Sequence, residues 1–287
     1  MLKKDKDGLL LTPWKYTNKQ LKNFYQKIYY QQNNSLVYKN KYSKEELYYE
    51  QLPFKLAEVF FKKKYKKILD VGCGMSNLLK YFNKLNYNCY GVDFSSYTID
   101  YHNKSLLKHI NFEPCDIINN QYFEGQKFDV IFLMSVAEHV ANFSLLIKTL
   151  FNKLNKGGLL IIQVPNEYGL VHKKYAKDNK LKKNDMPFYN PLDHLNYFNK
   201  NSLKNSVLNN IKMRLITMYS DFPIEMFMLN NDTNYYKNKH FGKNAHDLRM
   251  KITNLLQKNN KPTDIVKYYE QSLNIGLGRT ITAIFQK

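Results

Sequence analysis

The sequence is poor in cysteine and has no long apolar segment. Among its 287 residues no run of 18 apolar residues occurs, so no membrane-spanning helix is expected. The N-terminus lacks the long apolar stretch that directs export. The three cysteines, Cys73, Cys89 and Cys115, do not have the spacing of metal ligands, and an odd, small number favours a reducing compartment. These absences predict a cytoplasmic location.

Acidic residues are also scarce, with 24 Asp and Glu against 44 Lys and Arg, which gives a formal net charge of +20. Such an excess is compatible with nucleic-acid binding. However, Lys, Asn, Tyr, Ile and Phe are all abundant and all have A/T-rich codons, so base composition alone can raise the lysine content. The lysines are spread along the chain, and the densest run, 62–67, is expected to be a solvated surface. We therefore expect no nucleic-acid partner, although the charge is compatible with a small anionic ligand.

The most informative stretch is KILDVGCGMSNLL at residues 67–79. Its first part is an apolar run suited to a strand that is buried on both faces. Gly72 and Gly74 follow, at positions where a side chain would obstruct a tight turn or a close ligand. Ser76 and Asn77 are suited to cap the helix that comes next. A buried strand, a glycine turn and a helix N-terminus together predict a ligand cradle at the carboxyl edge of a parallel sheet.

The charge beside the glycines indicates which nucleotide this cradle holds. A dinucleotide site would read G-x-G-x-x-G, whereas here Asp70 stands two residues before Gly72. A carboxylate there would repel a pyrophosphate but suits an ammonium group. S-adenosylmethionine carries an ammonium and a sulfonium and no phosphate. About 20 residues later a second strand, CYGVDFS, places Asp93 where a carboxylate accepts hydrogen bonds from ribose hydroxyls.

At these residues the chain resembles the class I S-adenosylmethionine-dependent methyltransferases, whose first motif is D/E-x-G-x-G-x-G; Ser76 stands at the third glycine. Further motifs follow in the family's order, and the resemblance covers about residues 65–220. In chain order they are Asp93-Phe94, Cys115-Asp116-Ile117, FDVIFLMSVAEHV at 128–140 and LNKGGLLIIQVPN at 154–166. A Rossmann-like domain that binds another nucleotide, or none, is the alternative.

The resemblance implies a methyl-donor site for S-adenosylmethionine, with S-adenosylhomocysteine as its product. The residues that it places against the donor are Asp70, Gly72, Cys73, Gly74, Asp93, Phe94, Asp116, Ile117, Met134 and Ser135.

Strand and helix patterns alternate along the core, which predicts an α/β fold. Strands are expected near 67–71, 89–93, 110–113, 128–134, 158–164 and 211–219, and the resemblance implies a seventh, antiparallel strand, assigned to 279–286. The expected architecture is a seven-stranded, mostly parallel Rossmann-like sheet with helices on both faces. We divide the chain into an N-terminal helical cap (1–60), the donor-binding core (61–221), a helical insert or lid (222–278) and the final strand of the sheet (279–287).

Methyl transfer from a sulfonium is an in-line displacement, so the protein must align the acceptor and exclude water. An oxygen acceptor also benefits from a base, most often a histidine. His139 follows the fourth strand, and His194 lies in a long polar segment, 166–200, that leaves the fifth strand and should cover the donor site. These two histidines are the expected catalytic residues. Residues considered for acceptor binding are Glu138, Gln163, Asn166 and Arg249.

Glu138 and His139 resemble an element of the quinone-biosynthesis O-methyltransferases, some of which bind a divalent metal through E-x-x-E-H. Here Ser135 occupies the place of the first acid. Two ligands make a weak site for a hard cation, so no metal is expected.

The resemblance leaves several acceptors open. The long loop, the insert and the terminal GLGRTITAIFQK resemble bacterial methyltransferases that modify sugars, so a small soluble acceptor methylated at oxygen, a sugar or another surface-polysaccharide precursor, is the first expectation. A quinol or aromatic O-methyltransferase is the alternative, followed by an RNA methyltransferase and by a cofactor-binding protein without catalysis. The insert is also a candidate homodimer element.

Overall fold

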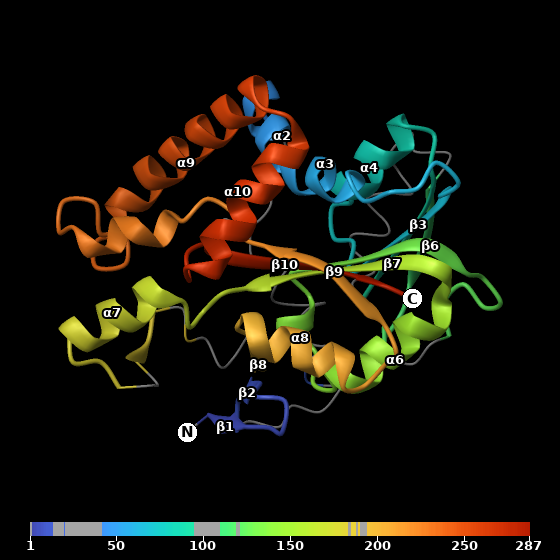
Figure 1. Ribbon diagram of the computed structural model, residues 1–287, viewed down its shortest axis with the longest axis horizontal. Coiled ribbons are helices and arrows are strands. Elements are labelled where there is room, and N and C mark those ends of the chain that lie inside the picture. The colour runs from blue at the N-terminus through green and yellow to red at the C-terminus, as the bar shows by residue number, and fades with distance from the viewer. Residues whose placement is uncertain are drawn as a thin grey trace.

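The computed structural model describes residues 2–13, 20, 42–94, 110–118, 121–182, 185–187, 189 and 194–287. Within this part of the chain the centre of the molecule is a seven-stranded sheet (Figure 1). Its strands are β3 (Lys67–Val71), β4 (Asn88–Asp93), β5 (Ile110–Pro114), β6 (Phe128–Met134), β7 (Leu154–Pro165), β9 (Arg214–Tyr219) and β10 (Thr280–Gln286). Their order in the sheet is β5-β4-β3-β6-β7-β10-β9, and β10 runs antiparallel to both of its neighbours. The α/β fold with a mostly parallel sheet is confirmed.

The central strands are apolar on both faces because helices cover both sides of the sheet. In β3, Leu69 and Val71 belong to one buried cluster and Ile68 to the other, as the alternation of side chains along a strand requires. The first cluster is closed by α6 (Phe143–Lys153) and α8 (Lys200–Leu208). The second is closed by α3 (Leu52–Glu58), α4 (Asn77–Lys84) and α10 (Pro262–Asn274). Figure 1 shows these two sets on opposite sides of the strands.

The strand order reverses between β3 and β6. From β3 the chain runs to β4 and β5 on one side of the sheet, and it then returns to β6 and β7 on the other. The crevice outside the carboxyl ends of the strands at such a reversal is where open α/β sheets bind ligands. We therefore expect the ligand site among the residues that follow β3, β4 and β6.

The first residues of the chain form strands, which the expected helical cap did not include. β1 (Lys3–Lys4) pairs with β2 (Leu10–Leu11), and β2 pairs with β8 (Asn196–Tyr197) in a small second sheet. The turn between β1 and β2 is held by the Asp5 carboxylate, which accepts hydrogen bonds from the backbone N–H groups of Asp7 and Leu9. The helical expectation is wrong for this segment.

Helices do occur later in the expected cap, as α2 (Lys44–Glu50) and α3. Residues 14–19 and 21–41 of that cap lie outside the described residues.

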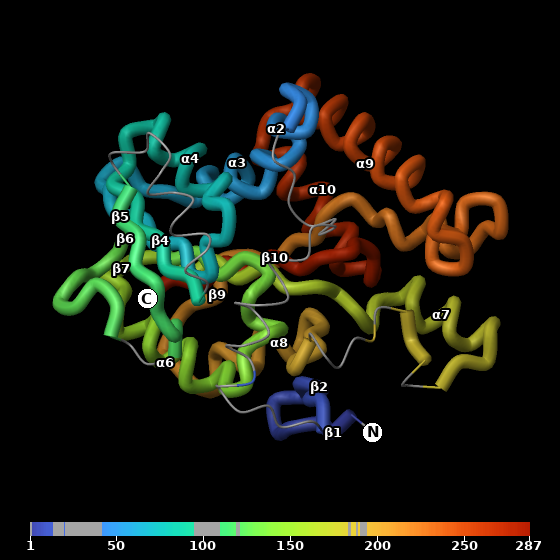
Figure 2. The backbone as a smooth tube through the Cα atoms, turned by 180° about the vertical axis from the view of Figure 1, so that it is seen from behind, coloured from blue at the N-terminus to red at the C-terminus, as the bar shows by residue number. Residues whose placement is uncertain are grey.

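The segment 166–200 also differs from the expected loop, because it contains the helix α7 (Leu170–Asp178). Val171, Tyr175 and Ala176 are buried at helical spacing. The insert at 222–278 contains a 3-10 segment, η4 (Ile224–Leu229), followed by α9 (His240–Asn259) and α10. Helix α9 packs on α2, and α10 packs on β9 (Figure 2). The boundaries of the four proposed parts stay a prediction.

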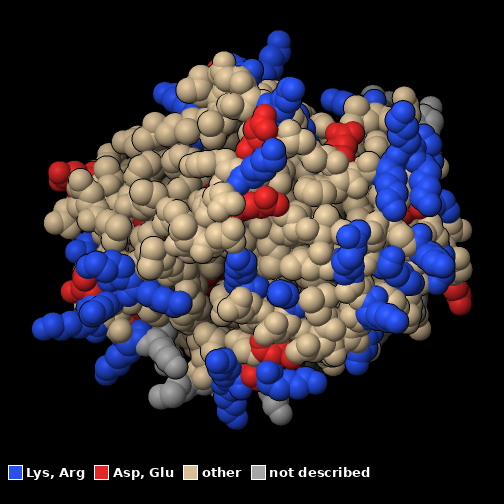
Figure 3. Space-filling model, viewed as in Figure 1, with Lys and Arg blue, Asp and Glu red and all other residues tan. Residues whose placement is uncertain are grey.

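The basic side chains do not gather in one place on the face seen in Figure 3. Lys and Arg are spread over several parts of that face, with acidic side chains among them.

Of the helices that the structure describes, none combines the length and the apolar character needed to cross a bilayer.

The turn before β10 generates a stability prediction. Gly278 has φ +111°, and a Cβ there would lie 2.2 Å from the Cβ of Ser220. Gly125 has φ +71°, but a Cβ there would meet nothing within 4 Å. Gly278→Ala should lower the free energy of unfolding by about 2–5 kcal/mol, because a steric overlap adds to the backbone strain. Gly125→Ala should cost only about 1 kcal/mol. Urea denaturation of both variants measures the difference, and equal losses would contradict the packing around Gly278.

Candidate active site

The loop after β3 is tied to the end of β4. The N–H groups of Gly72 and Cys73 both donate to the carbonyl oxygen of Val92, at 2.7 and 3.1 Å. Gly72 has φ +74°, and a Cβ there would lie 2.4 Å from Cγ2 of Val136, so this position requires glycine. The N–H of Gly74 donates to Oδ2 of Asp93 at 2.9 Å. The predicted cradle therefore exists, and its glycine turn rests against the two strand ends beside it.

Ser76 does not cap helix α4 as expected. Its φ of +54° is left-handed, and its side chain makes no capping hydrogen bond to the helix. The hydroxyl instead lies 3.5 Å from the carbonyl oxygen of Gly74, to which it donates. Asn77 is the first helical residue rather than a cap. A left-handed backbone explains why glycine suits this position in the D/E-x-G-x-G-x-G pattern, and it disfavours the capping geometry.

Two buried carboxyl groups face this cradle from adjacent strands. Asp70 in β3 is 4% exposed, and Asp93 at the end of β4 is 3% exposed. Burial, and to a lesser degree the negative charge of Asp93, raise the pKa of Asp70 to about 8. A cationic ligand would offset both effects, since it favours the ionised carboxylate. The electrostatics of the cradle therefore match a ligand with a positive charge and disfavour a phosphate.

The other expected donor residues follow the ends of neighbouring strands. Phe94 comes after β4, and Asp116 and Ile117 come after β5, where the N–H of Cys115 donates to the carbonyl oxygen of Asp93 at 2.9 Å. Met134 ends β6, and Ser135 follows it with φ +54°. All ten residues expected to contact the donor thus lie on β3 to β6 or just beyond them, toward the carboxyl edge. Their individual contacts with the donor stay a prediction.

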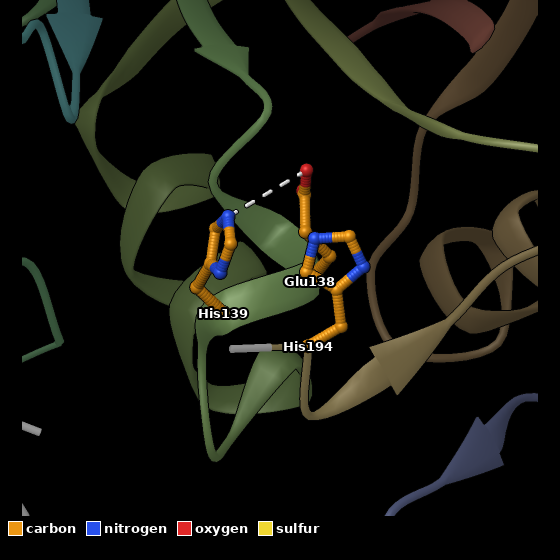
Figure 4. A group of neighbouring side chains, drawn as sticks. All are labelled: Glu138, His139 and His194. Carbon is orange, nitrogen blue, oxygen red and sulfur yellow. Dashed lines mark ion pairs between the residues drawn. The ribbon is translucent and has the colours of Figure 1, made fainter. Parts of the chain in front are cut away.

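A cluster of titratable side chains lies beside the end of β6. The 3-10 segment η2 (Ala137–His139) carries Glu138 and His139, whose Oε1 and Nε2 atoms are 3.8 Å apart. The ring of His194 lies 5.0 Å from that of His139, centroid to centroid. One donor atom from each of the three side chains lies within 4.8 Å of the others. Figure 4 shows the three side chains converging, although His194 comes from a distant part of the sequence.

Backbone contacts hold His194 in this position. The N–H of the next residue, Leu195, donates to the carbonyl oxygen of Glu138 at 2.7 Å. The side-chain amide of Asn196 donates to the carbonyl oxygens of Ala137 and Val140, at 2.8 and 2.7 Å. Because Asn196 also begins β8, the small sheet and η2 together fix the end of the long segment against β6.

Glu167 completes the cluster, and sequence reasoning missed it. Its carboxylate hydrogen-bonds Nδ1 of His194, and the side chain is buried. A carboxylate at Nδ1 fixes the orientation of the ring and favours the tautomer with its proton on Nδ1. The available signal was an acid two residues after Pro165, the last residue of β7.

Aromatic rings form one side of this cluster. Tyr197 is buried, and Tyr189 stacks on it with ring centroids 5.5 Å apart. Tyr168 meets the edge of Tyr197 at 6.2 Å, and the ring of His194 lies 6.2 Å from the same tyrosine. A histidine beside a group of tyrosines offers both polar and aromatic contacts.

The remaining expected acceptor residues have other contacts. Gln163 donates to Oγ1 of Thr282 at 3.1 Å, and the amide of Asn166 donates to the carbonyl oxygen of Gly278 at 3.0 Å. Both therefore join β7 to the β10 region. Arg249 belongs to α9, where its Nη2 lies 2.8 Å from Nδ1 of His246. Of the residues expected to bind the acceptor, the structure brings only Glu138 into the histidine cluster.

The sheet order, the acid-then-glycine cradle and the acid after the second strand define a class I S-adenosylmethionine-dependent methyltransferase. The cradle fits this cofactor, since the buried carboxyl group of Asp70 favours a ligand with a positive charge. The chain belongs to the methyltransferase domain family, whose model matches residues 44–210.

Two curated relatives illustrate the sequence similarity. The chloroplastic tocopherol O-methyltransferase of Arabidopsis thaliana is 32% identical over 106 residues, which cover 35% of this chain and 30% of that protein. The mitochondrial ubiquinone biosynthesis O-methyltransferase of Rattus norvegicus is 32% identical over 112 residues, covering 37% and 32%. The chain thus spans about a third of the length of each of these relatives.

Solved structures show the same fold at low identity. The plantazolicin methyltransferase BamL, in complex with a triazolic desmethylPZN analog and S-adenosylhomocysteine, superposes with a TM-score of 0.52 and 12% identity, covering 85% of each chain. The plantazolicin methyltransferase BpumL, in complex with S-adenosylhomocysteine, has a TM-score of 0.51 and 17% identity, covering 85% of this chain and 84% of that one. These similarities support the fold.

Titration of Asp70 generates a prediction about donor binding. A bound ammonium group lowers the pKa of Asp70 from about 8, so binding below that pH releases a proton. The affinity for S-adenosylhomocysteine should rise between about pH 6 and pH 8, by roughly tenfold or more, and then level off. Isothermal titration in two buffers of different ionisation enthalpy measures both the affinity and the protons released.

The control is Asp70→Asn, which keeps the shape of the side chain and removes the titration. Proton release should vanish in this variant. If the number of protons released does not change, the protons come from another group. The raised pKa of Asp70 also makes the stability of the free protein depend on pH. Because the pKa of Asp70 in the folded protein lies above the ordinary 3.8, this group stabilises the free protein at low pH, and that contribution is lost as the pH rises through 8.

Proposed function

We propose that this protein transfers a methyl group from S-adenosylmethionine to a hydroxyl oxygen of a small aromatic or quinol-like acceptor. The observation that carries the proposal is the cluster of His139, His194, Glu138 and Glu167, next to a group of three tyrosines of which one contacts His194. The cluster lies just after β6, the strand whose end is also expected to meet the donor.

Donor and acceptor sites are adjacent in this arrangement. Met134 and Ser135, which are expected to contact the donor, precede Glu138 and His139 by a few residues on the same strand end. The N–H of Ser135 donates to the carbonyl oxygen of Gln163 at 2.9 Å, so β7 supports the end of β6. A hydroxyl held at the two imidazoles would therefore lie next to the donor site, as in-line transfer requires.

The bound cofactor supplies an activated methyl group on a sulfonium. The acceptor hydroxyl must lose its proton as its oxygen gains the methyl group. We assign the promotion of this proton loss to His194 and His139, the two expected catalytic residues. Glu167 orients His194, and the pinned backbone at Leu195 and Asn196 keeps the ring in place. These contacts supply the positioning on which the rate of methyl transfer depends.

The aromatic class of acceptor is supported by two independent observations. Tyr197 lies beside His194, and the rings of Tyr168 and Tyr189 pack against Tyr197, so the surroundings of His194 are rich in aromatic surface. The relatives reported above are named for tocopherol and ubiquinone biosynthesis. Both observations favour the quinol or aromatic alternative over the sugar or polysaccharide precursor that the sequence analysis placed first.

The charge near the reaction centre disfavours an anionic acceptor. Asp70, Asp93, Glu138 and Glu167 are all buried at this edge of the sheet, so a phosphate would meet four acids. The lysines are dispersed over the visible face (Figure 3), so RNA is not the favoured acceptor. The polar cluster beside the donor cradle also favours an enzyme over an inactive binding protein. A cytoplasmic location and a homodimer stay predictions from the sequence.

Substitution of the histidines tests the proposed function. His194→Ala and His139→Ala should each lower turnover by roughly 10²–10⁴-fold and leave the affinity for S-adenosylhomocysteine nearly unchanged. His240→Ala is the matched control, because His240 lies exposed on α9. Labelled methyl transfer to hydroquinones and catechols, compared with nucleotide-linked sugars, measures both the rates and the acceptor class. Transfer to sugars but not to phenols would overturn the proposed acceptor. Unchanged rates in both alanine variants would show that the two histidines are not catalytic residues.

A further inference from the structure

We infer that Glu138, His139 and His194 form a binding site for one divalent transition-metal ion. The inference concerns the same residues as the proposed function and deepens it. Metal binding itself does not depend on the identity of the acceptor, so it can be measured apart from methyl transfer.

The first observation is the geometry of three donor groups. Two imidazole nitrogens and one carboxylate oxygen lie within 4.8 Å of one another, and the contact between Glu138 Oε1 and His139 Nε2 is 3.8 Å. Figure 4 shows the three side chains directed toward a common point. Metal–nitrogen and metal–oxygen bonds of about 2.0–2.2 Å place tetrahedral ligand atoms about 3.5 Å apart. A contraction of about an ångström, within the reach of side-chain rotation, would complete the site.

The second observation is a buried carboxylate oxygen that lacks compensation. Glu138 is 1% exposed, and its Oε2 has no hydrogen-bond partner within the described part of the chain. Burial of an incompletely paired carboxylate is costly, and a cation at this point would satisfy it. The other oxygen, Oε1, lies 3.8 Å from Nε2 of His139, so a cation bound between them would neutralise the carboxylate as a whole.

The third observation is the support around His194. Because Glu167 holds Nδ1 of the imidazole, Nε2 is the atom that would coordinate the ion. A carboxylate behind a histidine is the usual support of a metal-binding imidazole, because it fixes the tautomer and increases the basicity of the ligand. The hydrogen bonds of Leu195 and Asn196 to the backbone around η2 hold the loop in place before any ion binds.

The donor set selects the class of metal. Two imidazoles and one carboxylate suit zinc, manganese, iron or cobalt, whereas magnesium and calcium prefer oxygen ligands. The absence of a metal was expected because Ser135 replaces an acid and only Glu138 and His139 remained. The structure changes that premise, because His194 adds a third donor from the far end of the segment 166–200. Imidazole nitrogens that coordinate a cation cannot also accept a proton. With the ion bound, Lewis-acid polarisation of the acceptor oxygen would therefore promote loss of the hydroxyl proton in place of direct proton transfer to His194 or His139.

The test is metal binding by the full-length protein after treatment with a chelator. Isothermal titration with Zn²⁺ should give one saturable site, and Co²⁺ should give visible absorption bands typical of a low-coordinate nitrogen and oxygen site. His194→Ala, His139→Ala and Glu138→Gln should each weaken Zn²⁺ by at least tenfold. Glu167→Gln should weaken it by roughly 10–100-fold through its effect on His194. Mg²⁺ should compete poorly.

Two controls keep the outcome decisive. His240→Ala should retain full Zn²⁺ affinity, because this exposed histidine lies outside the cluster. S-adenosylhomocysteine binding by each variant reports that the donor domain is folded. Failure of Zn²⁺ and Co²⁺ to bind saturably, or binding that survives both His194→Ala and His139→Ala, overturns the inference. If the protein binds the metal at these residues but methylates no phenol, the metal site is supported and the proposed acceptor is refuted.

Discussion

The structure depends on the placement of two carboxyl groups, Asp70 and Asp93, in the interior at the ends of adjacent parallel strands. Most side chains of the paired strands β3 and β4 are buried, and these two acids are buried with them. One of them is held by the N–H of Gly74, and the other has its pKa raised to about 8. Burying acids together is unfavourable in the free protein, and a cationic nucleoside relieves it. Burial of these two acids thus destabilises the free protein and also favours a cationic ligand over a phosphate.

The second half of the site is built by different means. The donor cradle uses one continuous strand, turn and helix, whereas the proposed acceptor side combines η2, the end of β7 and the start of β8. Asn196 links these elements through two hydrogen bonds to the backbone around η2, and the N-terminal hairpin pairs with β8 from the other side. A segment at the very start of the chain therefore helps to hold His194.

The donor half could be predicted from the sequence because its signals are local. Residues 67–79 contain the strand, the glycine turn and the acid in one stretch, and the remaining strands are apolar runs of ordinary length. The acceptor half was only partly predictable. His139 and His194 were identified singly, but the approach of His194 to His139 and Glu167 depends on a loop returning to η2, which no local pattern encodes. The strands β1 and β2 have two residues each, which is too short for a periodic pattern to predict them. Serine is a common capping residue, so the residue type at position 76 did not reveal that its backbone is left-handed.

The most direct test of the central claim is a double-mutant cycle between Asp70 and the ammonium group of the ligand. The affinities of S-adenosylhomocysteine and of its analogue without the amino group are measured by calorimetry for the native protein and for Asp70→Asn. We predict that removal of the amino group weakens binding to the native protein by roughly tenfold or more and has little effect in the variant. An equal loss in both proteins would contradict recognition of the cation by Asp70.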